Sequence, residues 1–154
     1  MTYSLFKIIH ILGVVLLVGN VTITFIWKFH ADTTRDPIVL AFAQRIVTWT
    51  DWVFTAGGAA LVMIGGYGMT AVARIDPVAT GWLLWSQIWF YAVGLIWLLV
   101  LVPLQVLQSR QARKFAVTGT IPESYWQLCG YWNLVGIAST VPFLYVLYLM
   151  IEKS

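Results

Sequence analysis

The chain has 154 residues, of which 60% are hydrophobic and 10% are charged, and its mean hydropathy is +0.84. A soluble domain of this length has too little interior to bury so much apolar surface, so the composition excludes an ordinary soluble protein. The net charge of +3 is small and does not indicate a nucleic-acid partner. The lipid bilayer is the environment that this composition predicts.

A membrane-spanning helix needs roughly 20 apolar residues, and four segments of the chain meet that requirement. We expect helices over about 4–29, 37–73, 80–115 and 122–152. Asp36 and Pro37 are typical of a helix start, as the N-cap and the first helical residue. Because the connections are short, successive helices should be antiparallel neighbours. The sequence therefore predicts a single all-α transmembrane domain over residues 1–154, an antiparallel, up-down-up-down four-helix bundle.

Basic residues are unevenly shared between the two ends of these helices. One end carries Lys28, Arg35, Arg45, Arg110, Arg113 and Lys114. The other end carries Lys7, Arg74 and Lys153. Loops rich in lysine and arginine tend to stay in the cytoplasm. We therefore expect a multi-pass protein of the bacterial inner (plasma) membrane, with the first and third loops cytoplasmic and both termini periplasmic or external.

Glycines and prolines indicate where the predicted helices pack closely together and where they bend. The second helix contains Gly57, Gly58, Gly65, Gly66 and Gly68. Small residues let membrane helices approach closely, so tight helix packing is the favoured interpretation, and room for a flat cofactor is the alternative. Pro103 and Pro142 are expected to kink or loosen the third and fourth helices.

The first helix carries an ionisable residue, His10, at membrane depth. Such a residue is costly in lipid and usually has a partner or a function. At about 100° per residue it shares one helical face with small and polar residues, and that face should point to the bundle interior. The face comprises His10, Gly13, Leu17, Asn20, Thr24 and Trp27. It forms either an interhelical seam or, with His10 as an axial ligand, a haem site in which Gly13 makes room for the macrocycle.

The neighbours expected for His10 follow from its depth, which is about 10 Å inside the outer boundary. Met69 is the candidate second iron ligand in that layer, and Gln87 is a candidate cofactor-binding residue there, as a hydrogen-bonding partner. His30 lies at the opposite end of the helix, so two histidines of one chain cannot bind the same haem. A haem here would be five-coordinate, His/Met or His/water. A copper site from His10 and Met69 is the alternative metal hypothesis.

Asp51 lies near the cytoplasmic end of the second predicted helix. A carboxylate there could pair with Arg45 or Arg110 across the bundle, or take part in a proton relay, and a structural ion pair is the favoured interpretation. The sequence contains no acid/base pair, no nucleophile with its base and no glycine-rich phosphate loop. It therefore identifies no catalytic residue and leaves open whether the protein is an enzyme.

Several stretches resemble a bacterial family of predicted integral membrane proteins. They include Leu-Phe-Lys-Ile-Ile-His-Ile-Leu-Gly near the start, Trp27-Lys28, Phe42-Ala-Gln-Arg45, Thr50-Asp-Trp-Val-Phe-Thr55 and Val102-Pro-Leu-Gln105. The resemblance covers nearly the whole chain and implies a membrane protein without implying a function. More distantly, Lys7-x-x-His10-Ile is similar to the copper-resistance membrane proteins of the CopD type. It is also similar to the protoporphyrinogen oxidases of the HemJ type, four-helix proteins that bind haem b.

The resemblance to the HemJ type implies that His10 is an axial haem ligand. That group also uses a lysine in a later helix, and this chain has no match for it. Its lysines are Lys7, Lys28, Lys114 and Lys153. The difference argues against porphyrinogen oxidation and leaves haem binding as the implied property.

These observations lead us to expect a small inner-membrane protein that binds haem b and has an electron-transfer or redox role. Its redox partner would be a quinone or an external protein. The alternative is a cofactor-free structural or assembly subunit, with another membrane protein or a second copy as partner. A copper or small-solute carrier is a third hypothesis. It is disfavoured because the central layer holds only Asn20, Asn133 and a few hydroxyl groups.

Overall fold

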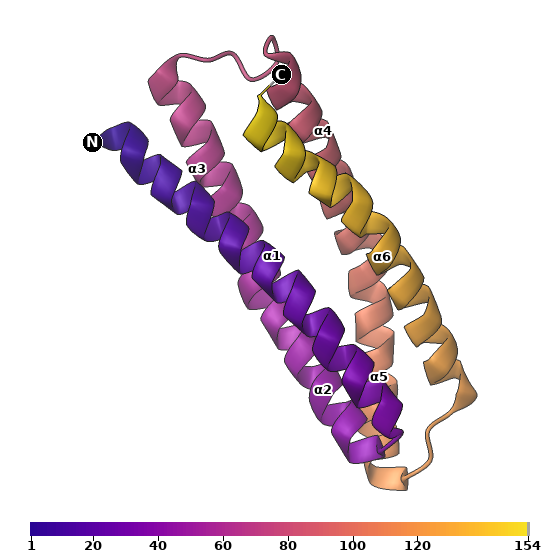
Figure 1. The fold of residues 1–154 in the computed structure, drawn as a ribbon. Helices are drawn as coiled ribbons and strands as arrows, with labels where there is room; N and C mark the ends of the chain where they lie inside the picture. Colours follow the sequence, from indigo (N-terminus) through magenta and orange to yellow (C-terminus); the bar gives the residue numbers. More distant parts are fainter. Residues whose placement is uncertain (154) are drawn as a thin grey trace. The chain divides into compact units, whose positions relative to one another are not determined.

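The computed structural model describes residues 1–153, and all its regular structure is helical. In chain order the elements are α1 (Thr2–Thr34), α2 (Pro37–Thr50), η1 (Asp51–Ala56), α3 (Gly57–Ala73), α4 (Gly81–Ile96), η2 (Trp97–Leu101), α5 (Val102–Thr118) and α6 (Glu123–Glu152) (Figure 1). The π-helical segments η1 and η2 continue their flanking α-helices. Four helices in the described chain are thus long and apolar enough to cross a membrane. The predicted all-α class with four membrane helices is confirmed.

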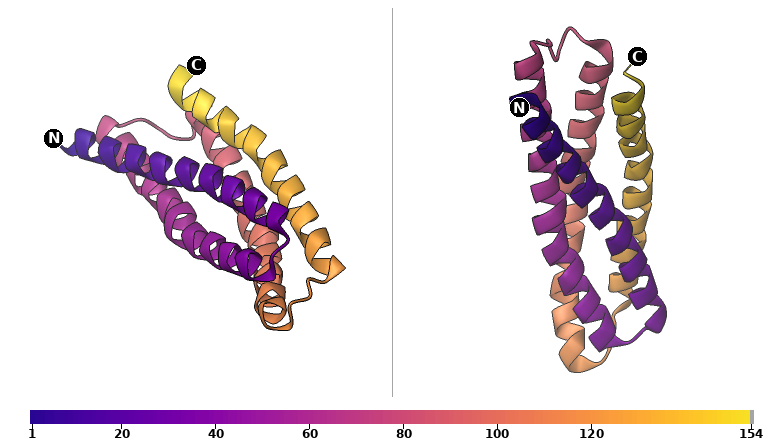
Figure 2. Two further views of the ribbon diagram at one scale, coloured as in Figure 1. Left: turned by 60° about the horizontal axis from the view of Figure 1, so that its bottom comes forward. Right: turned by 60° about the vertical axis from the view of Figure 1, so that its left-hand side comes forward.

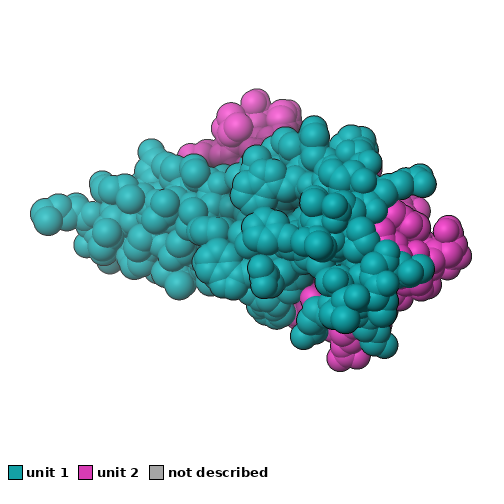
Figure 3. All heavy atoms as spheres, turned by 90° about the horizontal axis from the view of Figure 1, so that it is seen from below, with its two compact units in different colours: residues 1–75, 112–120 teal, residues 76–111, 121–154 magenta. Residues whose placement is uncertain are grey.

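The chain divides into two compact units, coloured separately in Figure 3. Unit 1 comprises residues 1–75 and 112–120, and unit 2 comprises residues 76–111 together with the chain from residue 121. In unit 1, α1 packs against α2, η1 and α3, which run back alongside it (Figures 1 and 2). In unit 2, α4 and η2 pack against α6. Each unit therefore contains a pair of long antiparallel helices.

The first helix is longer than the sequence predicted, because it continues past residue 29 to Thr34. Its added turn is held by local bonds. The Nζ atom of Lys28 donates to both carboxylate oxygens of Asp32, at 2.5 and 2.6 Å. The hydroxyls of Thr33 and Thr34 donate to backbone carbonyls three residues earlier, each at 2.7 Å. The polar composition of this stretch indicated a loop, but its polar groups find partners within the helix.

The turn between α1 and α2 follows the predicted chemistry. Arg35 ends α1 in the left-handed conformation, with φ of 52°. Asp36 then caps α2, accepting hydrogen bonds from the N–H groups of Ile38 at 2.8 Å and Val39 at 3.2 Å. Pro37 occupies the first turn, where its missing N–H costs nothing. The predicted start of the second helix is confirmed.

The two π-helical segments have different origins. The segment η2 ends two residues before Pro103, whose ring cannot donate to the carbonyl four residues earlier. The predicted loosening at Pro103 is therefore confirmed. No proline explains η1, which begins at the buried residue Asp51 and was not predicted. Pro142 lies inside α6, and a kink there stays a prediction.

The connection between α3 and α4 is organised by Asp76, whose Oδ1 atom accepts hydrogen bonds from the N–H groups of Val78 at 2.8 Å and Ala79 at 3.1 Å. The backbone bonds from Ala79 and Val78 hold the pKa of the Asp76 carboxyl below its ordinary value, because they favour the charged form. The folded pKa is thus below the unfolded one. The stabilising contribution of Asp76 is complete above the unfolded pKa and is lost as the pH falls through the folded pKa.

We expect Asp76→Ala to lower the thermal unfolding temperature at pH 7, and the difference should shrink as the pH falls below the unfolded carboxyl pKa of about 4 and through the lower folded pKa. Circular dichroism melts of both proteins over that pH range measure this. A difference that stays constant down to the acid limit would show that the carboxylate charge does not hold this turn.

Candidate functional site

His10 is positioned by α1 about two turns from the start of the helix. Its Nδ1 atom lies 2.8 Å from the carbonyl oxygen of Val62 in α3. A carbonyl can only accept a hydrogen bond, so in this contact Nδ1 carries the hydrogen. In the neutral ring the lone pair then resides on Nε2. This is the arrangement of a histidine that is oriented to bind a metal through Nε2.

Glycines of α3 bring its backbone against α1 on both sides of this hydrogen bond. A Cβ atom placed on Gly65 would lie 2.5 Å from the backbone nitrogen of His10, and one on Gly66 would lie 3.4 Å from Nδ1. Similar close approaches occur at Gly58, which meets α1 backbone, and at Gly68, which meets the Phe6 ring. The predicted tight packing is confirmed at these positions.

Gly13 does not have the role predicted for it in a haem site. A Cβ atom there would lie 2.6 Å from the backbone nitrogen of Val62 and 2.7 Å from the carbonyl oxygen of Gly58. The space beside Gly13 is therefore occupied by α3, and it offers no room for a macrocycle. The helical face was identified correctly, but the small residue on it serves contact between two backbones.

Met69 lies about one turn of α3 beyond Gly65 and two turns beyond Val62, the two residues opposite His10. Its neighbour Gly68 packs against Phe6, nearer the start of α1. Met69 stays a predicted second ligand.

Gln87 belongs to unit 2 and has a structural role there. Its Nε2 atom donates to the carbonyl oxygens of Pro77 at 2.8 Å and Leu83 at 3.1 Å. Both amide hydrogens therefore tie the connection before α4 to the first turns of that helix. This geometry gives no support to the cofactor-binding role predicted for Gln87, because its donors are already engaged by the backbone.

The polar face predicted on α1 is buried in the structure along most of its length. The buried residues of α1 are Gly13, Leu17, Asn20, Thr24, Lys28 and Ala31. His10 is half-buried. Trp27 was predicted on this face, but its side chain is 46% exposed. Lys28, which is only 2% exposed, lies on the buried face instead. The reason is the helical repeat, since Lys28 follows Asn20 and Thr24 at intervals of four residues.

A buried hydrogen-bonded cluster links the middle of this face to η1. The Nδ2 group of Asn20 donates to Asp51 Oδ1 at 2.7 Å and to Thr55 Oγ1 at 2.9 Å. Thr55 Oγ1 in turn donates to Asp51 Oδ1 at 3.1 Å. All three residues are at least nine-tenths buried. We call them the Asn20 cluster, and it ties α1 to the π-helical segment through the Asp51 side chain.

The ion pair predicted between Asp51 and Arg45 is wrong. Arg45 is exposed, and its guanidinium carbon lies 5.7 Å from the centre of the Phe42 ring. Asp51 instead accepts hydrogen bonds from neutral donors in unit 1. Pairing with Arg110, which belongs to unit 2, stays a prediction. The sequence identified Asn20 and Asp51 separately, but it did not connect them.

The comparisons with known proteins identify a family. The model of a family described as "Predicted integral membrane protein (DUF2269)" matches residues 4–154. No curated protein and no solved structure matches the chain. The similarity to the CopD and HemJ types therefore stays a prediction, as do the bacterial inner membrane and the orientation of the termini.

Proposed function

The chain belongs to the DUF2269 family of predicted integral membrane proteins, and on this premise we propose that it binds haem b through His10. The observation that carries the proposal is the 2.8 Å contact between His10 Nδ1 and the Val62 carbonyl oxygen. It fixes the tautomer and orients the ring, while Nε2 keeps the lone pair that an iron ion requires.

The supply of ligands favours haem over a bare metal ion. Within residues 1–153 there is no group of three or more His, Cys, Asp or Glu side chains that could hold a metal ion. A copper ion needs several protein ligands, whereas haem iron already has four porphyrin nitrogens and can be held by one histidine. Met69 would supply the second axial ligand in a six-coordinate form.

The proposed role is electron transfer at the membrane. Bound haem b would supply an iron that changes oxidation state inside an apolar macrocycle. His10 would anchor it near the outer ends of the helices, within reach of a quinone or an external redox protein. This placement assumes a bacterial inner membrane with both termini outside, as the distribution of basic residues favours.

The test is the absorption spectrum of the detergent-purified protein, oxidised and then reduced with dithionite, after expression with ample haem. We expect a Soret band and a reduced α-band. His10→Ala should lower the haem content at least tenfold while the protein still inserts. His30→Ala is the matched control, because His30 is exposed and its Nδ1 contacts the Ile26 carbonyl of its own helix at 2.9 Å. It should retain full haem.

A wild-type protein without a Soret band would overturn the proposal, and full haem in His10→Ala would overturn the ligand assignment. The first outcome would favour a cofactor-free structural or assembly subunit. One observation supports that second candidate, since the bond from His10 to Val62 also ties two helices together. A subunit of this kind would be colourless and would co-purify with a membrane-protein partner or a second copy.

A further inference from the structure

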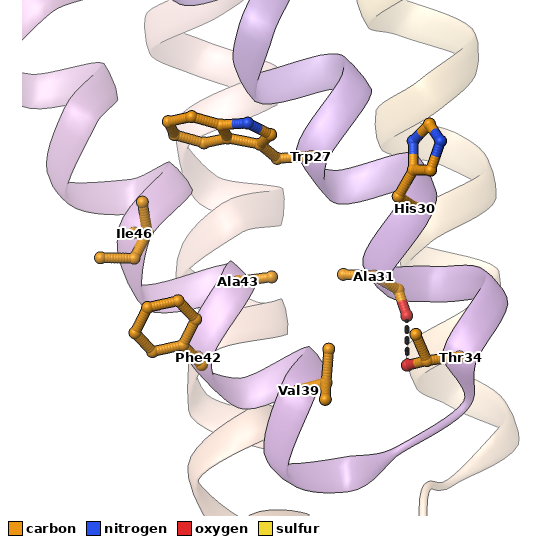
Figure 4. A pocket seen from close by; sticks show the side chains of 8 residues that line it. All are labelled: Trp27, His30, Ala31, Thr34, Val39, Phe42, Ala43 and Ile46. Carbon is orange, nitrogen blue, oxygen red and sulfur yellow. Dashed lines mark hydrogen bonds between the residues drawn. The ribbon is translucent and has the colours of Figure 1, made fainter.

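A groove of about 320 Å³ lies between the last turns of α1 and the first turns of α2 (Figure 4). Ala31 of α1 and Ala43 of α2 point toward each other across it, and because both side chains are small they leave the space between the helices open. Trp27, Phe42 and Ile46 line its sides. The lining is almost entirely apolar.

The groove lies beside positive charge. Arg45 is exposed, and its guanidinium lies over the Phe42 ring, which holds the side chain next to the groove. Arg35 lies at the turn that joins the two helices. The acidic groups nearby are already engaged, because Asp32 binds Lys28 and Asp36 caps α2. By count, Lys28, Arg35 and Arg45 outnumber Asp32 and Asp36, so the net charge of residues 27–46 is positive.

The depth of the groove suits a lipid headgroup. At 1.5 Å per residue, α1 is about 50 Å long, whereas the hydrocarbon core is about 30 Å thick. The end of α1 therefore reaches the level of the phosphates. Trp27, which is 46% exposed, is of the residue type enriched at that level.

We propose that this groove binds an anionic phospholipid. One acyl chain passes Ala31 and Ala43 and runs on toward Trp27 and Ile46, deeper in the bilayer, and the phosphate binds the Arg45 guanidinium over Phe42. An arginine guanidinium matches phosphate with several N–H donors, and basic pockets beside membrane helices are a known means of recognising anionic headgroups. The site is independent of His10 and of haem.

Native mass spectrometry of the protein in mild detergent tests this, with phosphatidylglycerol or phosphatidylcholine of identical acyl chains titrated in. The wild type should retain one phosphatidylglycerol at least tenfold more strongly than phosphatidylcholine. Arg45→Gln should remove most of that preference, and Ala43→Trp, which fills the groove, should remove the bound lipid. Arg74→Gln and Ala71→Trp are matched controls at exposed positions outside the groove and should behave like the wild type.

Equal retention of both lipids by the wild type would overturn the proposal. So would unchanged phosphatidylglycerol binding in Arg45→Gln and Ala43→Trp relative to their controls. If Ala43→Trp does not fold, Arg45→Gln decides the matter alone, because an exposed side chain can be replaced without disturbing the helix pair.

Discussion

Replacing Gly65 by alanine should destabilise unit 1 by more than about 2 kcal/mol, because it inserts an atom where two backbones already touch. The new Cβ would lie 2.5 Å from the nitrogen and 2.7 Å from the Cα of His10. No side-chain rotation relieves that overlap, so α1 and α3 must move apart. The separation would also lengthen the contact between His10 and Val62. Thermal unfolding in detergent, followed by circular dichroism, measures the loss.

Gly57→Ala is the matched control in the same helix. A Cβ atom there meets nothing within 4 Å. Alanine has a higher helix propensity than glycine by up to about 1 kcal/mol. This variant should therefore be as stable as the wild type or slightly more stable. If Gly65→Ala were equally stable, the close contact between α1 and α3 at His10 would be contradicted.

Asn20→Ala is expected to cost about 2–3 kcal/mol, because it removes two hydrogen bonds at a buried site, each worth about 1 kcal/mol or more. The variant removes the donor that serves both Asp51 and Thr55. Thr22→Ala is the control on the same helix. Thr22 is exposed and its hydroxyl donates only to the Val18 carbonyl. Its loss should change stability by less than about 0.5 kcal/mol.

A double-mutant cycle separates the Asn20 cluster from independent contributions. Asn20→Ala and Thr55→Ala should show a coupling energy of at least about 0.5 kcal/mol, since the two residues share a hydrogen bond and a common acceptor. Strictly additive effects would mean that the cluster does not act as a unit. The same melting experiment serves all four proteins of the cycle.

The helices and the turn at Asp36 could be predicted from the sequence because they depend on local properties. Long apolar segments must form helices in a membrane, where every backbone group needs an internal partner. Asp36 and Pro37 act on N–H groups within the next turn. The close packing of α3 was likewise visible in its glycines, because no other residue permits such approach.

The contacts of the site could not be predicted in the same way. Asn20 and Asp51, which form a hydrogen bond, are 31 residues apart in the sequence. The bond depends on the helical register at η1, and no proline in the sequence indicates that a π-helical segment forms there. Gly13 was correctly predicted to lie on the inward helical face, but the group that it contacts depends on the position of α3 along α1. Gln87 was assigned by depth alone, and depth does not reveal that backbone carbonyls engage its amide.

The ion pair between Lys28 and Asp32 affects how α1 is inserted into the membrane during synthesis. The two charges are four residues apart on one helix and are joined at 2.5 Å, with Lys28 almost completely buried. A lone ammonium group would oppose transfer of the emerging chain from the translocation machinery into lipid. Because α1 supplies the opposite charge itself, Lys28 can enter the bilayer as part of a neutral pair before any later helix has been synthesised, which leaves Lys7 as the unpaired charge of the helix sequence.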